Sequence, residues 1–288
     1  MKLLTMDVVV PAYNEEAGIA ECLDCLLAQG DDLRKIIIVD NASTDKTANI
    51  VKKYARKHSK IQLVNEAKAG VENARNTGFA TAKADIIGRI DVDTRVRSGW
   101  AQAVRQFLTD RQDFAGCTGF SEFYDMPFPR YCRFMAKVSR RFVNNQSGSK
   151  GAFVGSNMAI RRDAWQEIKD HVKGEESGEL MEDLALSLTL HEHGGKIGTV
   201  PNMLAGISGR RQRTSPLSYA RYSTRWWNTY VIYNRPFKAL LIRIFAVWLG
   251  NLTVAFWSPI LRFYDSKTKK WSFKNWQRGF EGRDFRAS

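Results

Sequence analysis

Cysteine and histidine are scarce in this chain, which has four of each among its 288 residues. Cys22 and Cys25 form a C-x-x-C pair, but structural zinc requires four ligands at close spacing, and no second pair lies near. Cys117 and Cys132 are isolated. We therefore expect reduced, apolar cysteine side chains, and neither a zinc site nor a disulfide framework.

A secretory signal is also missing from the start of the sequence. Residues 1–10 are too few for the apolar part of such a signal, and Asp7 interrupts them. The sequence contains no internal repeat, and its 44% hydrophobic and 26% charged residues are ordinary for a folded protein. We therefore expect a folded globular body that lies in the cytosol.

Acidic residues are rare in the last third of the chain. Residues 205–288 hold 16 Lys and Arg but 3 Asp and Glu, out of chain totals of 44 and 30, so nearly all of the net charge of +14 lies there. Six of the eight tryptophans also follow residue 205. A basic, Trp-rich segment around an apolar run indicates an anionic membrane surface as partner, with nucleic acid as the competing partner.

Residues 244–261 form that apolar run, 18 residues without a charge. This length is the lower limit for a membrane-spanning helix, and Asn251, Ser258 and Pro259 weaken that interpretation. Basic segments flank the run on both sides, and a single span would place one of them on the unfavourable side of the membrane. An in-plane or re-entrant helix is the first interpretation, a buried helix the second and a span the third.

Strand and helix patterns alternate over the first ninety residues. Short apolar runs predict strands at 6–10, 36–39, 61–64 and 86–90, and helical spacing predicts helices at 45–58 and 70–82, with another that Asn14 caps. This order predicts an α/β fold with a mostly parallel sheet and helices on both faces. In such sheets, ligands bind where the strands end.

Asp91-Val92-Asp93 follows the fourth predicted strand. In an extended segment, residues two apart point the same way, so the two carboxylates would repel unless a cation lies between or beside them. One or two carboxylates together with substrate phosphates is a binding mode of Mg²⁺ or Mn²⁺. The pattern alone also fits a solvated acidic turn, but its place at a strand end favours a metal site.

A second acidic segment, Asp40 to Asp45, follows the second predicted strand. Asp45 fits a turn and helix cap. Asp40 lies directly at the strand end, where a carboxylate can accept hydrogen bonds from a base or ribose. We therefore expect Asp40 to bind a ligand and Asp45 to cap a helix.

Six segments together resemble the family 2 inverting glycosyltransferases with the GT-A fold, over about residues 6–200. They are 8–16 (VVVPAYNEE), 39–45 (VDNASTD), 70–78 (GVENARNTG), 91–93 (DVD), 155–162 (GSNMAIRR) and 182–184 (EDL). The resemblance implies a Rossmann-like catalytic domain over residues 1–204. The charge and tryptophan distribution adds a basic, membrane-associating helical region over 205–288.

The resemblance also implies roles for individual residues. Donor-binding positions would be Pro11, Ala12 and Tyr13 around the nucleobase, Glu15 and Asp40 on the nucleoside, Arg75 in support, and Asp91 and Asp93 on the metal. Asp183 would be the catalytic base, which suits a carboxylate at a helix start. On the acceptor side the implied residues are Gly155, Ser156, Asn157, Glu182, Arg225 and Trp226.

The segment around Trp226 departs from the pattern of the processive members, which carry Gln-x-x-Arg-Trp. Tyr222 replaces the Gln here, so the sequence favours a single transfer over polymer synthesis. Trp226 fits either an acceptor contact or an interfacial anchor.

The resulting expectation is a glycosyltransferase at the cytoplasmic face of the membrane. It would use Mg²⁺ or Mn²⁺ and a nucleoside-diphosphate sugar, with uridine diphosphate first among the nucleotides. The acceptor would be lipid-linked or membrane-proximal, in the synthesis of polysaccharide, glycolipid or glycoconjugate. A nucleotidyltransferase is one alternative, but residues 11–16 contain no glycine-rich phosphate loop. A basic nucleic-acid-binding protein is the other, although we expect no nucleic-acid partner because the charge borders an apolar helix.

Overall fold

The computed structural model describes residues 3–130, 132, 134, 151–173, 179–242, 248–266 and 268–278. The chain divides into two compact units. The first comprises residues 1–122, 135–172 and 182–207, and the second comprises 123–134, 173–181 and 208–288. The second unit thus takes up two short segments from earlier in the sequence.

The first unit is built on a mixed sheet with the order β3-β2-β1-β4-β7-β6-β8-β5 in the described residues. The pairs β1–β2, β2–β3 and β1–β4 are parallel, whereas β4–β7, β6–β7 and β5–β8 are antiparallel. The expected mostly parallel sheet therefore holds for the first four strands alone. The strands are β1 (Met6–Ala12), β2 (Lys35–Asp40), β3 (Ile61–Asn65), β4 (Ile86–Arg89), β5 (Arg95–Val96), β6 (Gly116–Phe123), β7 (Met158–Arg161) and β8 (Ile197–Ile207).

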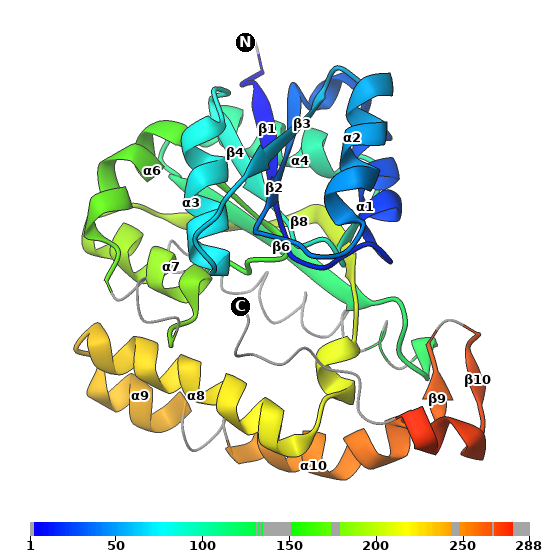
Figure 1. Cartoon of the computed structure of the whole chain (residues 1–288). Helices are drawn as coiled ribbons and strands as arrows, with labels where there is room; N and C mark the ends of the chain where they lie inside the picture. The colour runs from blue at the N-terminus through cyan, green and yellow to red at the C-terminus, as the bar shows by residue number, and fades with distance from the viewer. Residues whose placement is uncertain are drawn as a thin grey trace. The chain divides into compact units, whose positions relative to one another are not determined.

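Helices cover both faces of this sheet. Figure 1 shows α1 and α2 on one side of the parallel strands, and α3, α6 and α7 on the other. The helices of this unit are α1 (Ile19–Leu27), α2 (Thr47–Lys57), α3 (Val71–Thr81), α4 (Trp100–Asp110), α6 (Arg162–Ile168) and α7 (Glu182–Glu192).

Alternation along the strands divides the core into two layers. Val8 and Val10 pack with α1, α2 and α4, whereas Val9 of the same strand packs with α3, α6 and α7. Successive side chains of a strand point to opposite faces, so a continuous apolar run predicts burial on both. The central strands are therefore fixed between two layers of helices, and their ends form a rigid edge.

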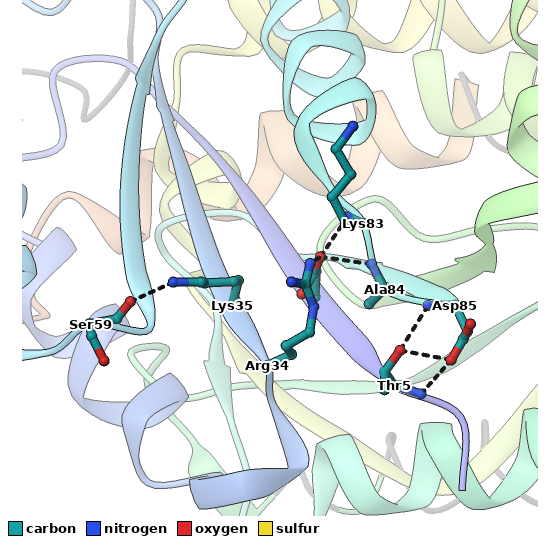
Figure 2. A network of polar contacts seen from close by, with 8 residues as sticks. Thr5, Arg34, Lys35, Ser59, Lys83, Ala84 and Asp85 are labelled. Atoms are coloured by element: carbon teal, nitrogen blue, oxygen red, sulfur yellow. Dashed lines mark hydrogen bonds and ion pairs between the residues drawn. The ribbon is translucent and has the colours of Figure 1, made fainter.

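A buried aspartate fastens the sheet at the edge where β1 begins. Asp7 is fully buried, and its Oδ2 accepts hydrogen bonds from the main-chain N–H groups of Lys83 (2.8 Å) and Ala84 (3.0 Å). The same oxygen pairs with the Arg34 guanidinium. Figure 2 shows Arg34, Lys83 and Ala84 converging in this network. Asp7 therefore joins β1, the start of β2 and the segment before β4.

Two local predictions were wrong at the boundaries of elements. β1 continues through Pro11 to Ala12, because the parallel ladder with β2 extends to Asp40. Asn14 does not cap the next helix, since α1 begins at Ile19 after Gly18. Composition also predicts a strand at 153–160, but the observed strand there, β7, begins at Met158. Helical spacing predicts a helix at 130–143, and this segment lies mostly outside the described residues.

The described residues of the second unit include the helices α8 (Pro216–Ile232), α9 (Pro236–Ile242) and α10 (Leu249–Leu261). Buried Asp125 ties its segments together, because it pairs with Arg213 (3.0 Å) and accepts a hydrogen bond from the Ser208 hydroxyl (2.5 Å). Short elements complete it: the 3₁₀ segments Arg210–Arg213 and Phe273–Arg278, and the hairpin of β9 (Tyr264–Asp265) and β10 (Lys270–Trp271).

The predicted apolar helix at 244–261 is described from Trp248 onward, where α10 runs to Leu261. Pro259 lies inside that helix. Among the described residues, no helix has both the length and the apolar content needed to cross a membrane.

Candidate active site

Two loops hold each other where β1 and β2 end. The Asn14 N–H donates to Ser43 Oγ (3.0 Å), and Asn14 Oδ1 accepts from the Thr44 N–H (2.8 Å). The Glu15 N–H donates to Thr47 Oγ1 (2.8 Å) in the same way. Each loop thus both donates to and accepts from the other. We call the two loops, residues 13–16 and 41–47, the rim at the carboxyl edge of the parallel strands.

Asp45 belongs to this rim. Its Oδ1 accepts from the Thr47 N–H (2.9 Å) at the start of α2, and its Oδ2 accepts from the Glu16 N–H (3.0 Å). The carboxylate is thus occupied by main-chain donors, which fits the predicted role as a cap.

Asp40 differs from Asp45 in having a buried oxygen that lacks a partner. It is the last residue of β2, lies opposite Ala12 in the register, and is 7% exposed. Its Oδ1 is buried and has no hydrogen-bond partner among the described residues. A buried carboxylate oxygen is costly without a donor, so this atom fits a ligand that brings one, such as a ribose hydroxyl or a base N–H.

The residues beside Asp40 divide into accessible and buried ones. Pro11 and Tyr13 are partly exposed at the end of β1. Ala12 is 2% exposed and belongs to the apolar core that includes residues of α1, and its place at the nucleobase stays a prediction. Glu15 is buried within the rim.

Asn41, which the motif analysis did not single out, positions the start of α3. Its side-chain N–H₂ donates to the carbonyls of Glu66 (3.0 Å) and Lys68 (2.7 Å), and its Oδ1 accepts from the Gly70 N–H (2.9 Å). Gly70 adopts a φ of 130°, which favours glycine. An amide that both donates and accepts can make such a bridge, whereas the neighbouring Asp40 cannot.

Asp91 and Asp93 lie in a tight turn and not in an extended segment. β4 ends at Arg89, and the Thr94 N–H donates to the Asp91 carbonyl (3.0 Å). Val92 between them is buried in the core. The two-residue repeat of a strand therefore does not apply to these carboxylates, which belong to one turn after β4.

Arg89, immediately before this turn, is the main site residue that the sequence analysis missed. Its side chain is 2% exposed, and its Nη2 lies 3.0 Å from Asp91 Oδ1 and 2.8 Å from Glu182 Oε1. Burial by itself would lower the pKa of Arg89, but Asp91, Glu182 and Asp183 raise it, so the guanidinium stays charged. It joins the acidic turn after β4 to the acidic pair at the start of α7.

The acidic pair at the start of α7 has two different environments. Burial and the neighbouring Glu182 raise the pKa of Asp183 to about 6, against the opposing effects of Arg89 and of two main-chain N–H groups. One of these donors is Gly155, whose N–H lies 2.8 Å from Asp183 Oδ2. Burial would also raise the pKa of Glu182, but Arg89 and Arg75 lower it. Asp183 is therefore the carboxylate better suited to take up a proton near neutral pH.

Arg75 lies with this pair. It is 1% exposed, and its Nη1 donates to the Glu182 carbonyl (3.1 Å) while its Nη2 contacts Asn76 Oδ1 (2.9 Å). Its support of the donor pocket stays a prediction, and the structure places its guanidinium against the first residue of α7.

The loop before β7 contacts the turn after β4. Thr94 Oγ1 donates to the Ser156 carbonyl (3.2 Å). The next residue, Asn157, is fully buried: its Oδ1 accepts from Trp100 Nε1 (2.8 Å), and its N–H₂ donates to the Phe120 and Met203 carbonyls (3.1 Å each). The Asn157 side chain is therefore not available to an acceptor as predicted. Gly155 and Ser156 keep their acceptor-side roles as predictions.

Arg225 and Trp226 lie on α8, in the second unit, and both are partly buried. Tyr222, one turn earlier, is covered by the Arg211 guanidinium, 3.7 Å from the ring centre. The acceptor contact of Trp226 stays a prediction.

Asp91 and Asp93 are the residues that fit a divalent cation. No group of three or more His, Cys, Asp or Glu side chains is gathered for a metal within the described part of the chain. Two carboxylates from one turn suit Mg²⁺ or Mn²⁺ when phosphate oxygens complete the coordination. Asp91 is 40% exposed and uses one oxygen for Arg89, so its carboxylate remains accessible.

Comparison with known proteins identifies the family to which this chain belongs. The sequence pattern of Glycosyl transferase family 2 matches residues 7–169, more than half of the chain. The uncharacterized glycosyltransferase EpsJ of Bacillus subtilis is 33% identical over 121 residues, 42% of this chain and 35% of EpsJ. The probable glycosyltransferase YdaM of the same organism is 26% identical over 245 residues, 80% of this chain and 57% of YdaM. The alignments thus span less than two thirds of either relative.

Solved structures share the fold. The mannosyltransferase PcManGT from Pyrobaculum calidifontis, in complex with GDP-Man and Mn²⁺, has a TM-score of 0.66 at 21% identity, over 89% of this chain and 73% of that one. TarS 1–349 of S. aureus has a TM-score of 0.58 at 15% identity, over 95% and 89% of the two chains. The fold is therefore of the GT-A type, and the nucleotidyltransferase and nucleic-acid-binding alternatives find no support in these matches. The chain belongs to glycosyl transferase family 2.

Proposed function

We propose that this protein transfers a single sugar from a nucleoside-diphosphate sugar to a hydroxyl group, with inversion at the anomeric carbon. The observation that carries the proposal is the arrangement around Arg89. It joins an accessible acidic turn, suited to a cation and a diphosphate, to Glu182, and the next residue, Asp183, has the raised pKa that suits a general base. An inverting transfer requires these two functions close together.

The donor would lie across the carboxyl edge of the parallel strands. The unpartnered Asp40 Oδ1 supports a contact with the nucleoside, and the partly exposed Pro11 and Tyr13 stand beside it. The resemblance favours uridine diphosphate. GT-A neighbours have been solved with both forms, GDP-Man in PcManGT and UDP in GalNAc-T7, so the nucleobase is a matter for experiment.

Asp91 and Asp93 would hold Mg²⁺ or Mn²⁺ beside the diphosphate. When bound, the cation would supply positive charge that stabilises the departing nucleoside diphosphate. PcManGT and GalNAc-T7 were both solved with Mn²⁺, which supports this assignment.

Asp183 would act as the base. Its carboxylate would accept the proton of the acceptor hydroxyl as that oxygen bonds to the anomeric carbon from the face opposite the leaving group. A pKa near 6 leaves Asp183 deprotonated at neutral pH and still basic enough to take the proton. The Gly155 N–H keeps the carboxylate oriented.

The acceptor would be lipid-linked or membrane-proximal, because α10 exposes apolar residues on its outer side. Leu252 is 58% exposed and Phe256 65%, whereas Val254 and Ser258 on the inner side are at most 1% exposed. A helix in water normally exposes polar residues, so the exposed Leu252 and Phe256 suit an apolar surface. Exposed basic residues such as Lys238 of α9 are within the same unit. This combination supports in-plane binding to anionic lipid at the cytoplasmic face of the membrane, in polysaccharide, glycolipid or glycoconjugate synthesis.

Flotation with phosphatidylglycerol vesicles tests the membrane assignment. Phe256→Ser should weaken binding by removing buried apolar area, and Lys238→Glu should weaken it in a salt-dependent way. Lys57→Glu, an exposed lysine on α2 of the first unit, is the matched control and should bind as the unmodified protein does. Absence of vesicle binding by the unmodified protein would refute the assignment.

Donor hydrolysis across a set of nucleotide sugars, with Mn²⁺ or Mg²⁺, tests the proposed chemistry. We expect turnover with one nucleotide class, its loss in excess chelator, and a severe loss in Asp93→Asn with the fold intact. Asp31→Asn, a fully exposed surface aspartate, is the control and should retain full activity. Turnover that persists in excess chelator would contradict the metal assignment.

A further inference from the structure

Arg89 occupies a position where a charge is unexpected. It is the last residue of β4, a strand with β1 on one side and β7 on the other, and its guanidinium is almost fully buried. A buried charge is unfavourable unless it is paired and hydrogen-bonded. Packing alone therefore does not explain a buried arginine at this position, because an apolar side chain would fill the same space.

The pairing of Arg89 is concentrated on one atom. Nη2 contacts both Asp91 and Glu182, whereas Nε and Nη1 are buried without a hydrogen-bond partner among the described residues. A guanidinium placed for stability alone would use its fork of donors more fully. Nη2 instead contacts two acidic side chains, Asp91 and Glu182, that are far apart in the sequence.

Gly155 adapts to Arg89 from the other side. A Cβ atom at position 155 would overlap Nη1, so the loop before β7 approaches the guanidinium as closely as it does because the residue is glycine. The N–H of the same glycine donates to Asp183 Oδ2. Arg89 thereby shapes the loop that orients the proposed base.

We propose that Arg89 is a positioning residue that ties the turn at 91–94 to the first turn of α7, so that the cation-binding carboxylates and Asp183 keep one fixed arrangement. The significance of this link rests on the proposed function. The link itself is a physical property of the chain without any ligand.

The proposal requires that each acidic group respond to loss of the other through Arg89. Asp91→Asn removes one partner from Nη2 and should loosen the first turn of α7. Glu182→Gln should likewise loosen the turn at 91–94. If Arg89 is already Lys, these remote effects should disappear, since an ammonium on a flexible stem lacks the guanidinium's fixed fork.

Hydrogen–deuterium exchange of the full chain, without metal or nucleotide, measures this. We expect Asp91→Asn to speed exchange in α7 between about twofold and a hundredfold, the range for residues that share one partner. We expect the same for Glu182→Gln at 91–94, and no remote effect of either substitution in Arg89→Lys. Arg161→Met is the control, because Arg161, the last residue of β7, donates to the main-chain carbonyls of Leu108, Arg111 and Phe114 and to neither acidic group.

Effects confined to the substituted element would overturn the proposal, and so would remote effects that persist in Arg89→Lys. Arg161→Met should loosen neither turn; if it loosens both, the coupling is general instability and the proposal fails. Adding UDP or GDP with Mn²⁺ then tests the proposed function separately. Linked turns in a protein that binds neither nucleotide would leave the link standing and the function refuted.

Discussion

Replacing Asp183 by Asn tests the proposed base through two properties that change in opposite directions. In the folded chain, burial and Glu182 raise the pKa of Asp183 to about 6, from its ordinary value of 3.8. The transfer rate should therefore rise with pH up to about 6 and level off above it, falling about tenfold for each pH unit below. Asp183→Asn has no base and should lose this activity at every pH.

The stability of the same variant should change the other way. Because the folded state binds the Asp183 proton more tightly than the unfolded state, the free energy of unfolding falls as pH rises from about 4 to 6. A rise to about 6 corresponds to at most about 3 kcal/mol. Asn carries no charge to bury but offers fewer acceptors to the Gly155 and Leu184 N–H groups. We expect Asp183→Asn to be about 1–2 kcal/mol more stable above pH 7.

Urea unfolding of both proteins at several pH values between 4 and 8 measures this effect. The two stability curves should converge toward pH 4 and separate toward pH 7. Asp31→Asn, at a fully exposed position, serves as the control. Parallel curves, or a variant that is less stable at pH 8, would refute the reasoning about the environment of Asp183.

Three further substitutions test the structure. Asp7→Ala leaves two main-chain N–H groups and a guanidinium without their acceptor, and should lower the free energy of unfolding by about 2–4 kcal/mol in urea melts. Gly155→Ala should lower the free energy of unfolding by about 1–3 kcal/mol, because the added Cβ overlaps Arg89 Nη1. It should also reduce sugar transfer by displacing the loop before β7, and unchanged turnover would contradict this. Burial would raise the pKa of Asp125, but Arg213 holds that pKa below its usual range. The pair therefore stabilises the fold above pH 4, and this stabilisation is lost in acid. Asp125→Asn should flatten the acid limb of the curve of unfolding free energy against pH.

The sheet and its edge could be predicted from the sequence because they depend on local patterns. The apolar run at Val8 to Val10 is buried on both faces, as its composition indicates. Asp40 is the last residue of β2, and Asp91 lies in the turn after β4. These features follow from strand periodicity and from the position of polar residues after apolar ones.

The contacts that organise the site could not be predicted in this way. Arg89 reads as the polar end of a short strand, and its pairing with Glu182 depends on a helix more than ninety residues away. Asn157 reads as an accessible polar residue, but three buried hydrogen bonds use up its amide. The turn at Asp91 is set by one main-chain hydrogen bond, which residue spacing does not reveal.

The configuration of the released sugar tests the central claim most directly. Proton NMR of the first product formed from an α-linked nucleotide sugar with Mn²⁺, recorded before mutarotation, distinguishes the two outcomes. Inversion predicts the β-anomer from the unmodified protein and none from Asp183→Asn. The α-anomer from the unmodified protein, or equal turnover by Asp183→Asn, would contradict the assignment of Asp183 as the base.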